Sequence, residues 1–287
     1  MPETPPRHGV RHIQVTPEEG GQKLLQFLQR RLGPDVPGSL LMRLIRKGRV
    51  RVDGGRKKPF DRLETGQTVR IPPLDQQPAA PQTPLPELTI LARGNGWIAI
   101  AKPAGLPTQP GTGHLDAVST RLKAMFPDAP FTPTPAHRLD RDTSGILLVG
   151  SSYQGLRSLQ QAFEQHTIQK LYLARVHGCL PPGETFTMQD HLEKTGSPGS
   201  QRMTTGSGKP ALAHARCQSS TSTTSLLEID LRTGRTHQIR AQLASRGLPI
   251  CGDHKYGQPD DAPSMLLHAW RVTLPGGDVV ELKPDWE

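Results

Sequence analysis

The residues with the clearest chemical potential in this 287-residue chain run from His137 to Gly145 and read HRLDRDTSG. The apolar residues Ile146 to Val149 follow at once. A short aliphatic and β-branched run predicts a buried strand, so the charged segment is expected to form a loop at the mouth of that strand, where catalytic residues often lie. In the alternative, structural interpretation, Asp140 and Asp142 accept hydrogen bonds within the loop and the arginines are solvated.

A second group of polar residues lies on a predicted strand that follows this loop. Residues 168–176 alternate between two faces, which places Lys170 and Tyr172 on the same side of the strand. A tyrosine at such a position can also be an ordinary core residue. The spacing therefore predicts a shared direction for the two side chains and leaves the role of Tyr172 open.

A third group follows the predicted strand 225–231, where residues 233–240 read TGRTHQIR. A helix starting near Thr236 and ended by Gly247 would place His237 and Arg240 one turn apart. Two cationic or potentially cationic side chains at a strand-to-helix junction suit an anionic ligand or a buried carboxylate. This helix is therefore a candidate for the opposite wall of a site.

Other elements must position these groups. The turn Gly94-Asn95-Gly96 predicts a hairpin of strands 88–93 and 97–101. Apolar periodicity predicts helices over residues 116–126, opened by Asp116, and over residues 155–165. Residues 179–210 are polar and rich in Gly, Pro and Thr, which favours surface loops that touch the substrate.

Positive charge is concentrated in the first quarter of the chain. The net charge is +9, and residues 1–75 hold 15 Lys or Arg against 8 Asp or Glu, a net of +7. Two helices are predicted there, the second capped by Ser39, followed by a strand over residues 49–52 and a turn at Asp53-Gly54. A solvated helix face is the simpler interpretation of a charge run, but the clustering with the hairpin favours contacts to phosphates.

Several sequence motifs resemble those of the RluA-type family of RNA pseudouridine synthases. HRLDRDTSG is similar to that family's signature HRLDxxTSG, and KxYxAxVxG, GRTHQIR and GLPICGDHKYG follow in the same order, through Gly257. The loop KPAGL at residues 102–106 is similar as well. The resemblance covers about residues 15 to 285. The N-terminal helices and basic hairpin resemble the RNA-binding domain first described in ribosomal protein S-four.

The resemblance implies an α+β protein with a mainly antiparallel mixed-sheet catalytic domain of the pseudouridine synthase type, preceded by a small α/β RNA-binding domain. The expected boundaries are a flexible N-terminus over residues 1–14, the RNA-binding domain over 15–72, a linker over 73–86 that is stiffened by its prolines, and the catalytic domain over 87–287. The form of the N-terminal part is most similar to the subgroup that acts on large-subunit ribosomal RNA.

The resemblance also implies roles for single residues. Asp140 is the reacting carboxylate, by attack on the anomeric carbon or by removal of a ribose proton, and Arg240 compensates its charge. Arg138 fills the space left by a flipped uridine, and Tyr172 lies under the flipped base. The residues expected to bind RNA are Arg43, Arg46, Lys47, Arg49, Arg51, Arg56, Lys57, Lys58, Lys170, Arg235 and His237. The isomerisation is redox-neutral and loses no atom, so no cofactor is expected.

The remaining composition indicates a soluble, cytoplasmic monomer without a metal site. Cys179, Cys217 and Cys251 are widely spaced and form neither a CxxC motif nor a disulfide pattern. No apolar run approaches the length of a membrane helix, and the N-terminus lacks a signal-peptide core. Structured RNA, most simply ribosomal RNA or an assembly precursor, is the expected partner.

Two other functional classes are open to the same sequence. A non-catalytic RNA-binding or ribosome-assembly protein would need only the basic N-terminal part. A glycoside or nucleoside hydrolase would pair Asp140 with Asp142 and release free uracil, whereas an isomerase leaves the mass of the RNA unchanged.

Overall fold

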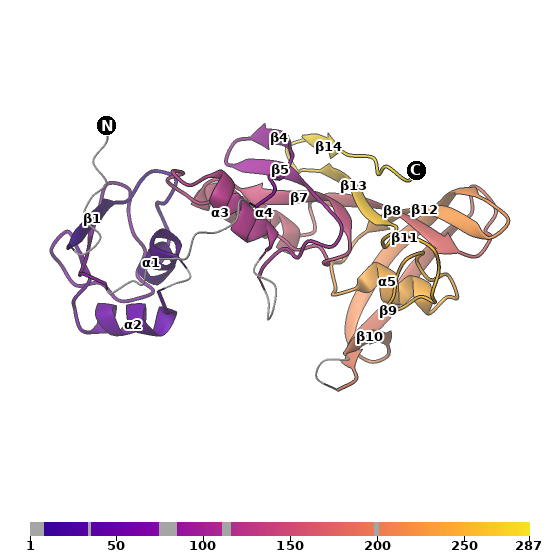
Figure 1. Cartoon of the computed structure of the whole chain (residues 1–287), viewed down its shortest axis with the longest axis horizontal. Coiled ribbons are helices and arrows are strands. Elements are labelled where there is room, and N and C mark those ends of the chain that lie inside the picture. Colours follow the sequence, from indigo (N-terminus) through magenta and orange to yellow (C-terminus); the bar gives the residue numbers. More distant parts are fainter. Residues whose placement is uncertain (1–8, 34–35, 75–84, 111–115, 198–200) are drawn as a thin grey trace.

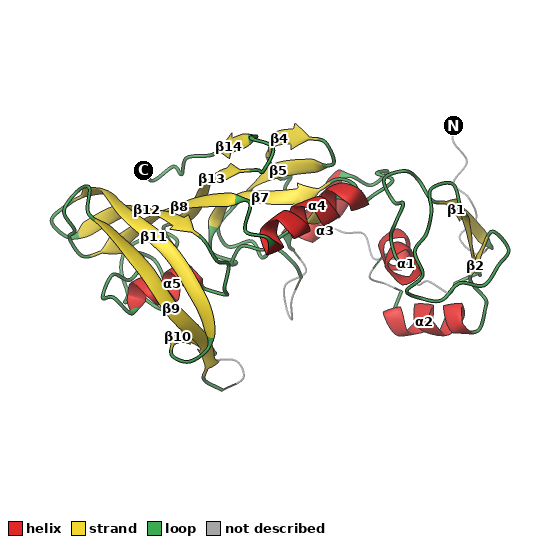
Figure 2. Cartoon of the chain, turned by 180° about the vertical axis from the view of Figure 1, so that it is seen from behind, coloured by secondary structure: helices red, strands yellow, loops and turns green. Residues whose placement is uncertain are grey.

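The computed structural model describes residues 9–33, 36–74, 85–110, 116–197 and 201–287. A small N-terminal unit lies at one end of an elongated molecule, and a large sheet forms the rest (Figures 1 and 2). The strands are β1 (Arg11–Gln14), β2 (Arg51–Val52), β3 (Thr68–Ile71), β4 (Ile90–Gly94), β5 (Trp97–Lys102), β6 (Thr134–Pro135), β7 (Ser144–Gly150), β8 (Gln169–His177), β9 (Thr185–Thr195), β10 (Arg202–Thr205), β11 (Lys209–Ser220), β12 (Thr224–Leu231), β13 (Leu267–Thr273) and β14 (Val279–Glu281). The helices are α1 (Leu24–Leu32), α2 (Gly38–Arg46), α3 (Val118–Met125), α4 (Tyr153–Glu164) and α5 (Gln238–Ala244).

The large sheet is mixed and mainly antiparallel, as expected from the resemblance. Its strands are ordered β10-β9-β11-β12-β8-β13-β7-β5-β4, with β14 added to β13 and β6 to β7. Among the described pairings only β13 and β7 run parallel, with His268 opposite Ser144. Both strands of this parallel pair are interior strands of the sheet, so the loop before β7 begins between neighbouring strands and not at a sheet edge.

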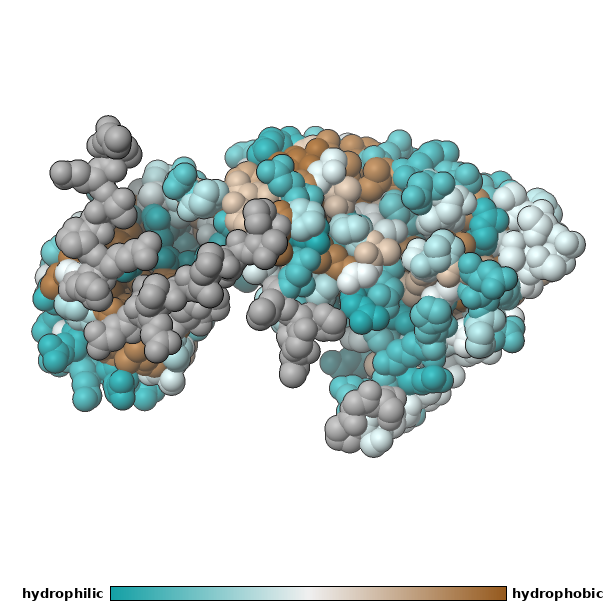
Figure 3. All heavy atoms as spheres, viewed as in Figure 1, coloured by the Kyte–Doolittle hydropathy of each residue, from teal (hydrophilic) through white to brown (hydrophobic). Residues whose placement is uncertain are grey.

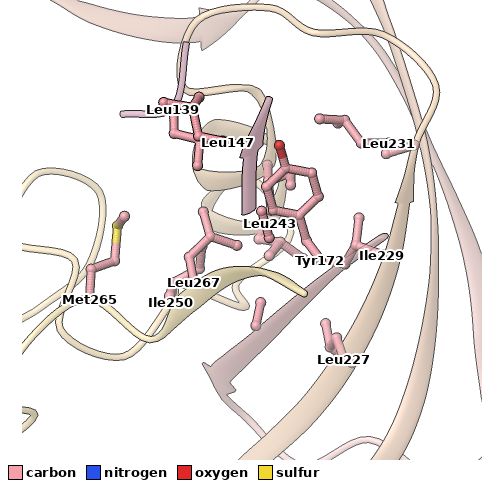
Figure 4. Packing of buried hydrophobic residues seen from close by; sticks show 14 of the residues in the cluster. Leu139, Leu147, Tyr172, Leu227, Ile229, Leu231, Leu243, Ile250, Met265 and Leu267 are labelled. Carbon is pink, nitrogen blue, oxygen red and sulfur yellow. The ribbon is translucent and has the colours of Figure 1, made fainter. Parts of the chain in front are cut away.

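Helices cover both faces of this sheet. Leu122 of α3 and Leu243 of α5 belong to the larger apolar cluster, which also contains Tyr172 of β8 (Figure 4). Leu159 of α4 belongs to the cluster on the other face, with Ile146 of β7. The alternating burial of β7 residues between these two clusters explains why its sequence is a continuous apolar run.

The N-terminal unit has an apolar core of its own, formed by α1, α2 and the sheet β1-β3-β2. Leu24, Leu28 and Leu32 form the buried stripe of α1, as their spacing predicts. Leu41 and Ile45 are the buried residues of α2. Hydrophilic residues gather along the outer lower edge of this unit, beside some hydrophobic ones, on the face that Figure 3 shows.

Three expectations for the N-terminal unit were wrong in detail. Residues 11–14 are not a flexible end but form β1, which pairs with β3 in register Arg11 to Ile71. Pro37 rather than Ser39 stands at the N-cap of α2, without a side-chain cap hydrogen bond. The strand expected over residues 49–52 is limited to Arg51–Val52. Most of the predicted linker, residues 75–84, lies outside the described residues.

The expectation of surface loops over residues 179–210 was also wrong. Thr185–Thr195 and Arg202–Thr205 pair as β9 and β10, and Lys209 already belongs to β11. The resulting long arm extends this end of the sheet beside α5 (Figures 1 and 2). Asp116 does not cap α3, whose N-cap is Ala117, and is instead paired with Arg121 at 2.7 Å.

The N-terminal unit makes direct contacts with the sheet-bearing part. The Arg30 Nη1 atom of α1 donates to the Thr134 hydroxyl at 2.7 Å, and its guanidinium lies 4.4 Å from the ring centre of Phe131. The backbone N–H of Tyr153 donates to the Glu18 carbonyl at 2.7 Å. These contacts lie at the N-terminal ends of β6 and α4 and at the C-terminal end of β7, where Gly150 lies opposite Thr134, remote from α5 (Figure 1).

Candidate active site

A pocket of about 490 Å³ lies where the loop before β7, strand β8, the end of β12 and the start of α5 meet. It brings together Asp140, Tyr172 and Arg240, which are far apart in the sequence. Of the other residues singled out in the sequence, Arg138, Lys170, Arg235 and His237 line it too. The pocket thus joins all three polar groups that the sequence analysis considered separately.

The loop that carries Asp140 is held by close packing at its C-terminal end. Gly145 has φ +112°, and a Cβ atom there would lie 2.3 Å from the Ala269 carbonyl oxygen of β13. Only glycine satisfies both conditions, so the closing Gly of HRLDRDTSG is required by the parallel pairing. The Thr143 amide donates to the Asp140 carbonyl at 3.2 Å, which turns the chain just before the strand.

Lys102 supports the same loop from below, although the sequence analysis gave its KPAGL segment no role. Its ammonium group is buried and donates to three carbonyls, those of Pro103 at 2.8 Å, Leu106 at 2.7 Å and Arg141 at 2.9 Å. Burial lowers the pKa of Lys102 to about 7, partly opposed by the carboxylates of Asp142 and Asp140. The buried Lys102 side chain therefore joins the two loops.

Arg240 connects two carboxylates. Its Nη1 atom donates to Asp140 Oδ2 at 3.2 Å, while Nε and Nη2 donate to Asp253 at 2.7 and 2.8 Å. The Asp253 side chain is 0% exposed and that of Asp140 is 19% exposed. The expected pairing of Arg240 with Asp140 is therefore present, but the stronger, two-pronged pairing is with Asp253.

The electrostatic state of this group follows from burial and hydrogen bonding. Burial alone would raise the pKa of Asp253, but the bonds from Arg240 and the backbone amides of Lys255 and Tyr256 outweigh it and lower that pKa. Burial alone would lower the pKa of Arg240, and its two carboxylate partners raise it instead. Both groups are charged at neutral pH, and Arg240 stands fixed beside Asp140.

Tyr172 and Lys170 project into the pocket from β8, as their spacing predicts. The ring of Tyr172 lies beside Leu231 and Ile229, with its hydroxyl directed away from Ile229 (Figure 4). Burial, with a smaller contribution from the Asp140 carboxylate, raises the pKa of Tyr172, so the phenol is neutral. Burial lowers the pKa of Lys170. Tyr172 presents an aromatic surface and a hydroxyl, and no phenolate.

His237 does not lie within a helix, in contrast to the expectation that a helix starts near Thr236. α5 begins at Gln238, and His237 is its N-cap with φ 50° and ψ 26°. Its Nε2 atom lies 3.9 Å from Asp140 Oδ2, and its Nδ1 atom lies 3.0 Å from the Tyr256 hydroxyl. His237 and Arg240 still face the same pocket, since the left-handed residue turns the chain directly into the first helical turn.

The two remaining predicted residues of the pocket lie nearer its surface. Arg138 is exposed. Arg235 is half-buried, and its Nε atom donates to the Pro210 carbonyl at 3.0 Å. Both side chains stand at the rim of the pocket.

The structure does not bring the N-terminal basic residues into the pocket. Of these, Arg43, Arg46, Lys47, Arg49, Arg56 and Lys58 are exposed. Lys57 and Arg51 are half-buried, and the Lys57 ammonium donates to the Arg62 carbonyl at 2.9 Å. The N-terminal unit therefore presents a separate cationic surface.

Three residues of the site escaped sequence reasoning: Asp253, Tyr256 and Lys102. The first two lie in the string GDHKYG, which was quoted for the resemblance but was given no chemistry. The acidic residue Asp253, thirteen residues after Arg240 and directly after an apolar segment, could have suggested the partner of Arg240. No local signal indicated that Tyr256 would reach His237.

Asp142 does not form a carboxylate pair with Asp140 across the pocket. It is paired with its neighbour Arg141 at 2.8 Å, and its side chain is 37% exposed. Asp142 is not among the lining residues of the pocket. This geometry weakens the hydrolase alternative.

A group of possible metal ligands lies outside the pocket. His177, Cys251 and Asp260 place their ligand atoms within 4.8 Å of one another. Asp260 Oδ2 already accepts hydrogen bonds from His177 at 2.7 Å and from the Gly252 amide at 2.8 Å. These bonds satisfy the carboxylate and close the loop after Gly252, which accounts for the cluster without an ion.

Comparison with known proteins identifies the chain's relatives. Residues 96–245 match the family described as RNA pseudouridylate synthase. The chain is 36% identical over 281 residues to ribosomal large subunit pseudouridine synthase C of Haemophilus influenzae, covering 92% of this chain and 86% of the relative. It is 35% identical over 265 residues to the protein of that name from Escherichia coli strain K12, covering 89% and 81%.

Solved structures support the same fold. Human RNA Pseudouridylate Synthase Domain Containing 1 superposes with a TM-score of 0.58 at 24% identity, covering 69% of this chain and 84% of the other. Human RNA Pseudouridylate Synthase Domain Containing 4 gives 0.56 at 23% identity, covering 69% and 89%. Across the part of the chain that the structure describes, no helix is long and apolar enough to span a bilayer. The chain belongs to the RNA pseudouridylate synthase family, and it is an isomerase that forms pseudouridine in RNA.

Proposed function

We propose that this protein isomerises specific uridines of large-subunit ribosomal RNA, with Asp140 as the reacting carboxylate. The observation that carries the proposal is the convergence of Asp140, Tyr172 and Arg240 in one pocket. The substrate class follows the names of relatives that are about 35% identical over most of the chain.

Pseudouridine formation breaks the bond between the ribose C1′ and uracil N1, turns the base, and joins C1′ to uracil C5. Asp140 either attacks C1′ or removes a neighbouring ribose proton, and both routes need one ionised carboxylate beside the sugar. Arg240 holds that carboxylate in place and balances its charge. Because Asp253 already takes two of the guanidinium's hydrogen bonds, Asp140 keeps acceptor capacity for the substrate.

A uridine in folded RNA must leave its stack to reach this pocket, at a cost of a few kcal/mol. The ring of Tyr172 stacks under the flipped base, and stacking on an aromatic side chain contributes about 1–3 kcal/mol per base. Arg138, exposed at the rim, enters the space that the uridine leaves. Lys170, Arg235 and His237 face the bound nucleotide from the pocket walls.

The N-terminal unit serves as an RNA-binding domain of the S-four type over residues 15–72, joined by the linker 73–86 to a catalytic domain over 87–287. Its exposed cations on α2 and the following turn support phosphate contacts. We propose that the protein acts as a monomer in the cytoplasm, in keeping with the three free thiols.

The deciding experiment compares Asp140→Asn and Asp142→Asn on an unmodified transcript of large-subunit ribosomal RNA. Asp140→Asn is expected to form no pseudouridine while binding RNA within a few-fold of wild type, because a neutral amide cannot perform the carboxylate's role. Asp142→Asn, a control from the same loop, should retain substantial activity. Wild-type turnover by Asp140→Asn would disprove the assignment. Mapping pseudouridines in ribosomal RNA from cells with and without the protein identifies the target uridines.

A further inference from the structure

His237 stands at the edge of the proposed catalytic group in a backbone conformation that histidine seldom adopts. Its φ of 50° lies in the left-handed region, where only glycine is free of strain. Strain of this kind costs about 1–3 kcal/mol and persists where the surrounding structure imposes it, often at functional sites. The conformation turns the imidazole toward Asp140, with Nε2 at 3.9 Å from Oδ2.

Tyr256 fixes the orientation of this imidazole. Its hydroxyl lies 3.0 Å from His237 Nδ1, and the two rings meet edge to face at 5.6 Å. Tyr256 also lies under the Arg240 guanidinium, 5.1 Å from the ring centre. One aromatic ring thus contacts both basic side chains that face Asp140.

The direction of the hydrogen bonds decides which imidazole nitrogen carries the proton. The backbone N–H of Met203 in β10 can only donate, and it donates to the Tyr256 oxygen at 2.8 Å. With that acceptor position occupied, the phenol is best placed to donate its proton to His237 Nδ1. An imidazole that accepts at Nδ1 carries its proton at Nε2 in the neutral state. The nitrogen facing the pocket is therefore a hydrogen-bond donor.

The surroundings keep this imidazole neutral. Burial lowers the pKa of His237, the Asp140 carboxylate opposes this, and the positive charges of Arg240 and Lys255 add to the lowering, with Asp253 opposing them. A neutral ring with its proton on Nε2 can donate one hydrogen bond to a group bound in the pocket.

We propose that the His237 Nε2–H group holds the detached uracil through one of its ring carbonyl oxygens, and that Tyr256 is the positioning residue that presents this donor. The inference rests on the proposed function, gives His237 a specific role in it and adds Tyr256. When the C1′–N1 bond breaks, its electron pair leaves with uracil, and the negative charge spreads to the carbonyl oxygens. A fixed donor stabilises that charge while the base turns. After C1′ bonds to C5, the C5 proton is lost and N1 gains one, so atoms and charge balance without proton transfer from His237.

The test uses the full chain and an unmodified large-subunit ribosomal RNA transcript under single-turnover conditions. Loss of one such donor in other enzymes costs about 10²–10³-fold in rate, so His237→Leu should slow pseudouridine formation by about 10²-fold at saturating enzyme. The concentration for half-maximal rate should change by less than about 3-fold. His237→Gln, which retains an N–H donor, should recover at least about 10-fold of that loss. His254→Leu, the same change in an exposed histidine of the neighbouring loop, is the control and should react at the wild-type rate.

A second measurement separates positioning from simple packing. Ring-nitrogen NMR shifts of His237 should show the proton on Nε2 in the wild-type protein and a mixture of both neutral forms in Tyr256→Phe. Tyr256→Phe should also lower the saturating rate by about 5- to 10-fold. The proposal is overturned if His237→Leu reacts at the wild-type rate, if His237→Gln is as slow as His237→Leu, or if the wild-type proton resides on Nδ1. Inactivity of the wild-type protein on this RNA would instead count against the proposed function.

Discussion

The buried pairing of Arg240 with Asp253 leads to the most quantitative prediction. Asp253→Asn replaces one carboxylate oxygen, which accepts from Arg240 Nε at 2.7 Å, by an NH₂ group that cannot accept. The guanidinium is left half-compensated in a site where its side chain is 6% exposed. Breaking a buried ion pair by removing one partner costs about 3–5 kcal/mol. Such a loss is a large part of the roughly 5–15 kcal/mol that stabilises a typical domain.

Arg240→Met should cost a similar amount, because it leaves the Asp253 charge buried with only two backbone amides as donors. The double variant Arg240→Met/Asp253→Asn removes both charges and keeps an amide oxygen for those two donors. Its loss of unfolding free energy should be about 3 kcal/mol smaller than the sum of the two single-variant losses. This difference is at the upper end of the coupling energies measured for contacting residues. All three variants should form little pseudouridine, because none holds a guanidinium in its place beside Asp140.

Urea unfolding at pH 7 gives the three stability losses, and single-turnover pseudouridine formation gives the activities. The control is Glu281→Gln, which breaks the exposed pair of Arg271 and Glu281, whose side chains are 39% and 53% exposed. That loss should stay below about 1 kcal/mol. Additive losses in the double variant, or wild-type stability and activity in Asp253→Asn, would refute the argument that Asp253 holds Arg240 for Asp140.

Three further predictions rest on single contacts. Lys102→Met leaves the buried Leu106 carbonyl and the part-buried carbonyls of Pro103 and Arg141 without their donor. It should destabilise the protein by about 1–3 kcal/mol in urea unfolding and slow catalysis by loosening the Asp140 loop. Burial and the nearby charge of Lys170 lower the pKa of His137 to about 3, so between that value and 6.5 only the unfolded state is protonated and stability falls with falling pH. From pH 7 to pH 5 the loss of unfolding free energy amounts to about 2 kcal/mol, because it grows by 1.36 kcal/mol for each of the 1.5 pH units between 6.5 and 5. The variant His137→Gln should lack this pH-dependent loss, because its amide does not titrate and its oxygen still accepts the backbone N–H of Leu148. An equal pH dependence in both proteins would contradict this. Neutralising Arg46 and Lys47 should make the slope of log affinity against log salt shallower by up to about 1.4–1.8 on long RNA, whereas neutralising Arg157 of α4 should leave it unchanged.

Local sequence patterns were sufficient for the elements that carry the site. The apolar run after HRLDRDTSG predicted a strand buried on both faces, and β7 is such a strand. The two-residue spacing of Lys170 and Tyr172 predicted a common direction, because side chains alternate strictly along a strand. His237 and Arg240 lie at one wall of the pocket as predicted, although His237 precedes the helix and does not belong to its first turn. Each of these inferences depends on backbone geometry over fewer than ten residues.

Local patterns misled where pairing with distant residues determined the structure. Residues 11–14 look too polar to be ordered, yet they form β1 because β3, more than fifty residues later, supplies their hydrogen-bond partners. Residues 179–210 are rich in turn formers, yet Thr185–Thr195 form β9 by pairing with β11, and Arg202–Thr205 form β10 by pairing with β9. Strand pairing joins residues that are far apart in the sequence, so the intrinsic β-propensity of a segment is a weak guide to whether it forms a strand.

The identities of the partners in the site were decided only by the tertiary structure. The sequence predicted that Arg240 pairs with the carboxylate of Asp140. In the folded chain Asp253 accepts two hydrogen bonds from Arg240, whereas Asp140, one hundred residues before Arg240, accepts one. Tyr256 reaches His237 because the loop after α5 returns over the helix N-terminus, and Met203 of the projecting arm fixes its hydroxyl. Charge and hydrogen-bond partners depend on separations of a few ångströms between distant segments, which residue spacing along the chain does not contain.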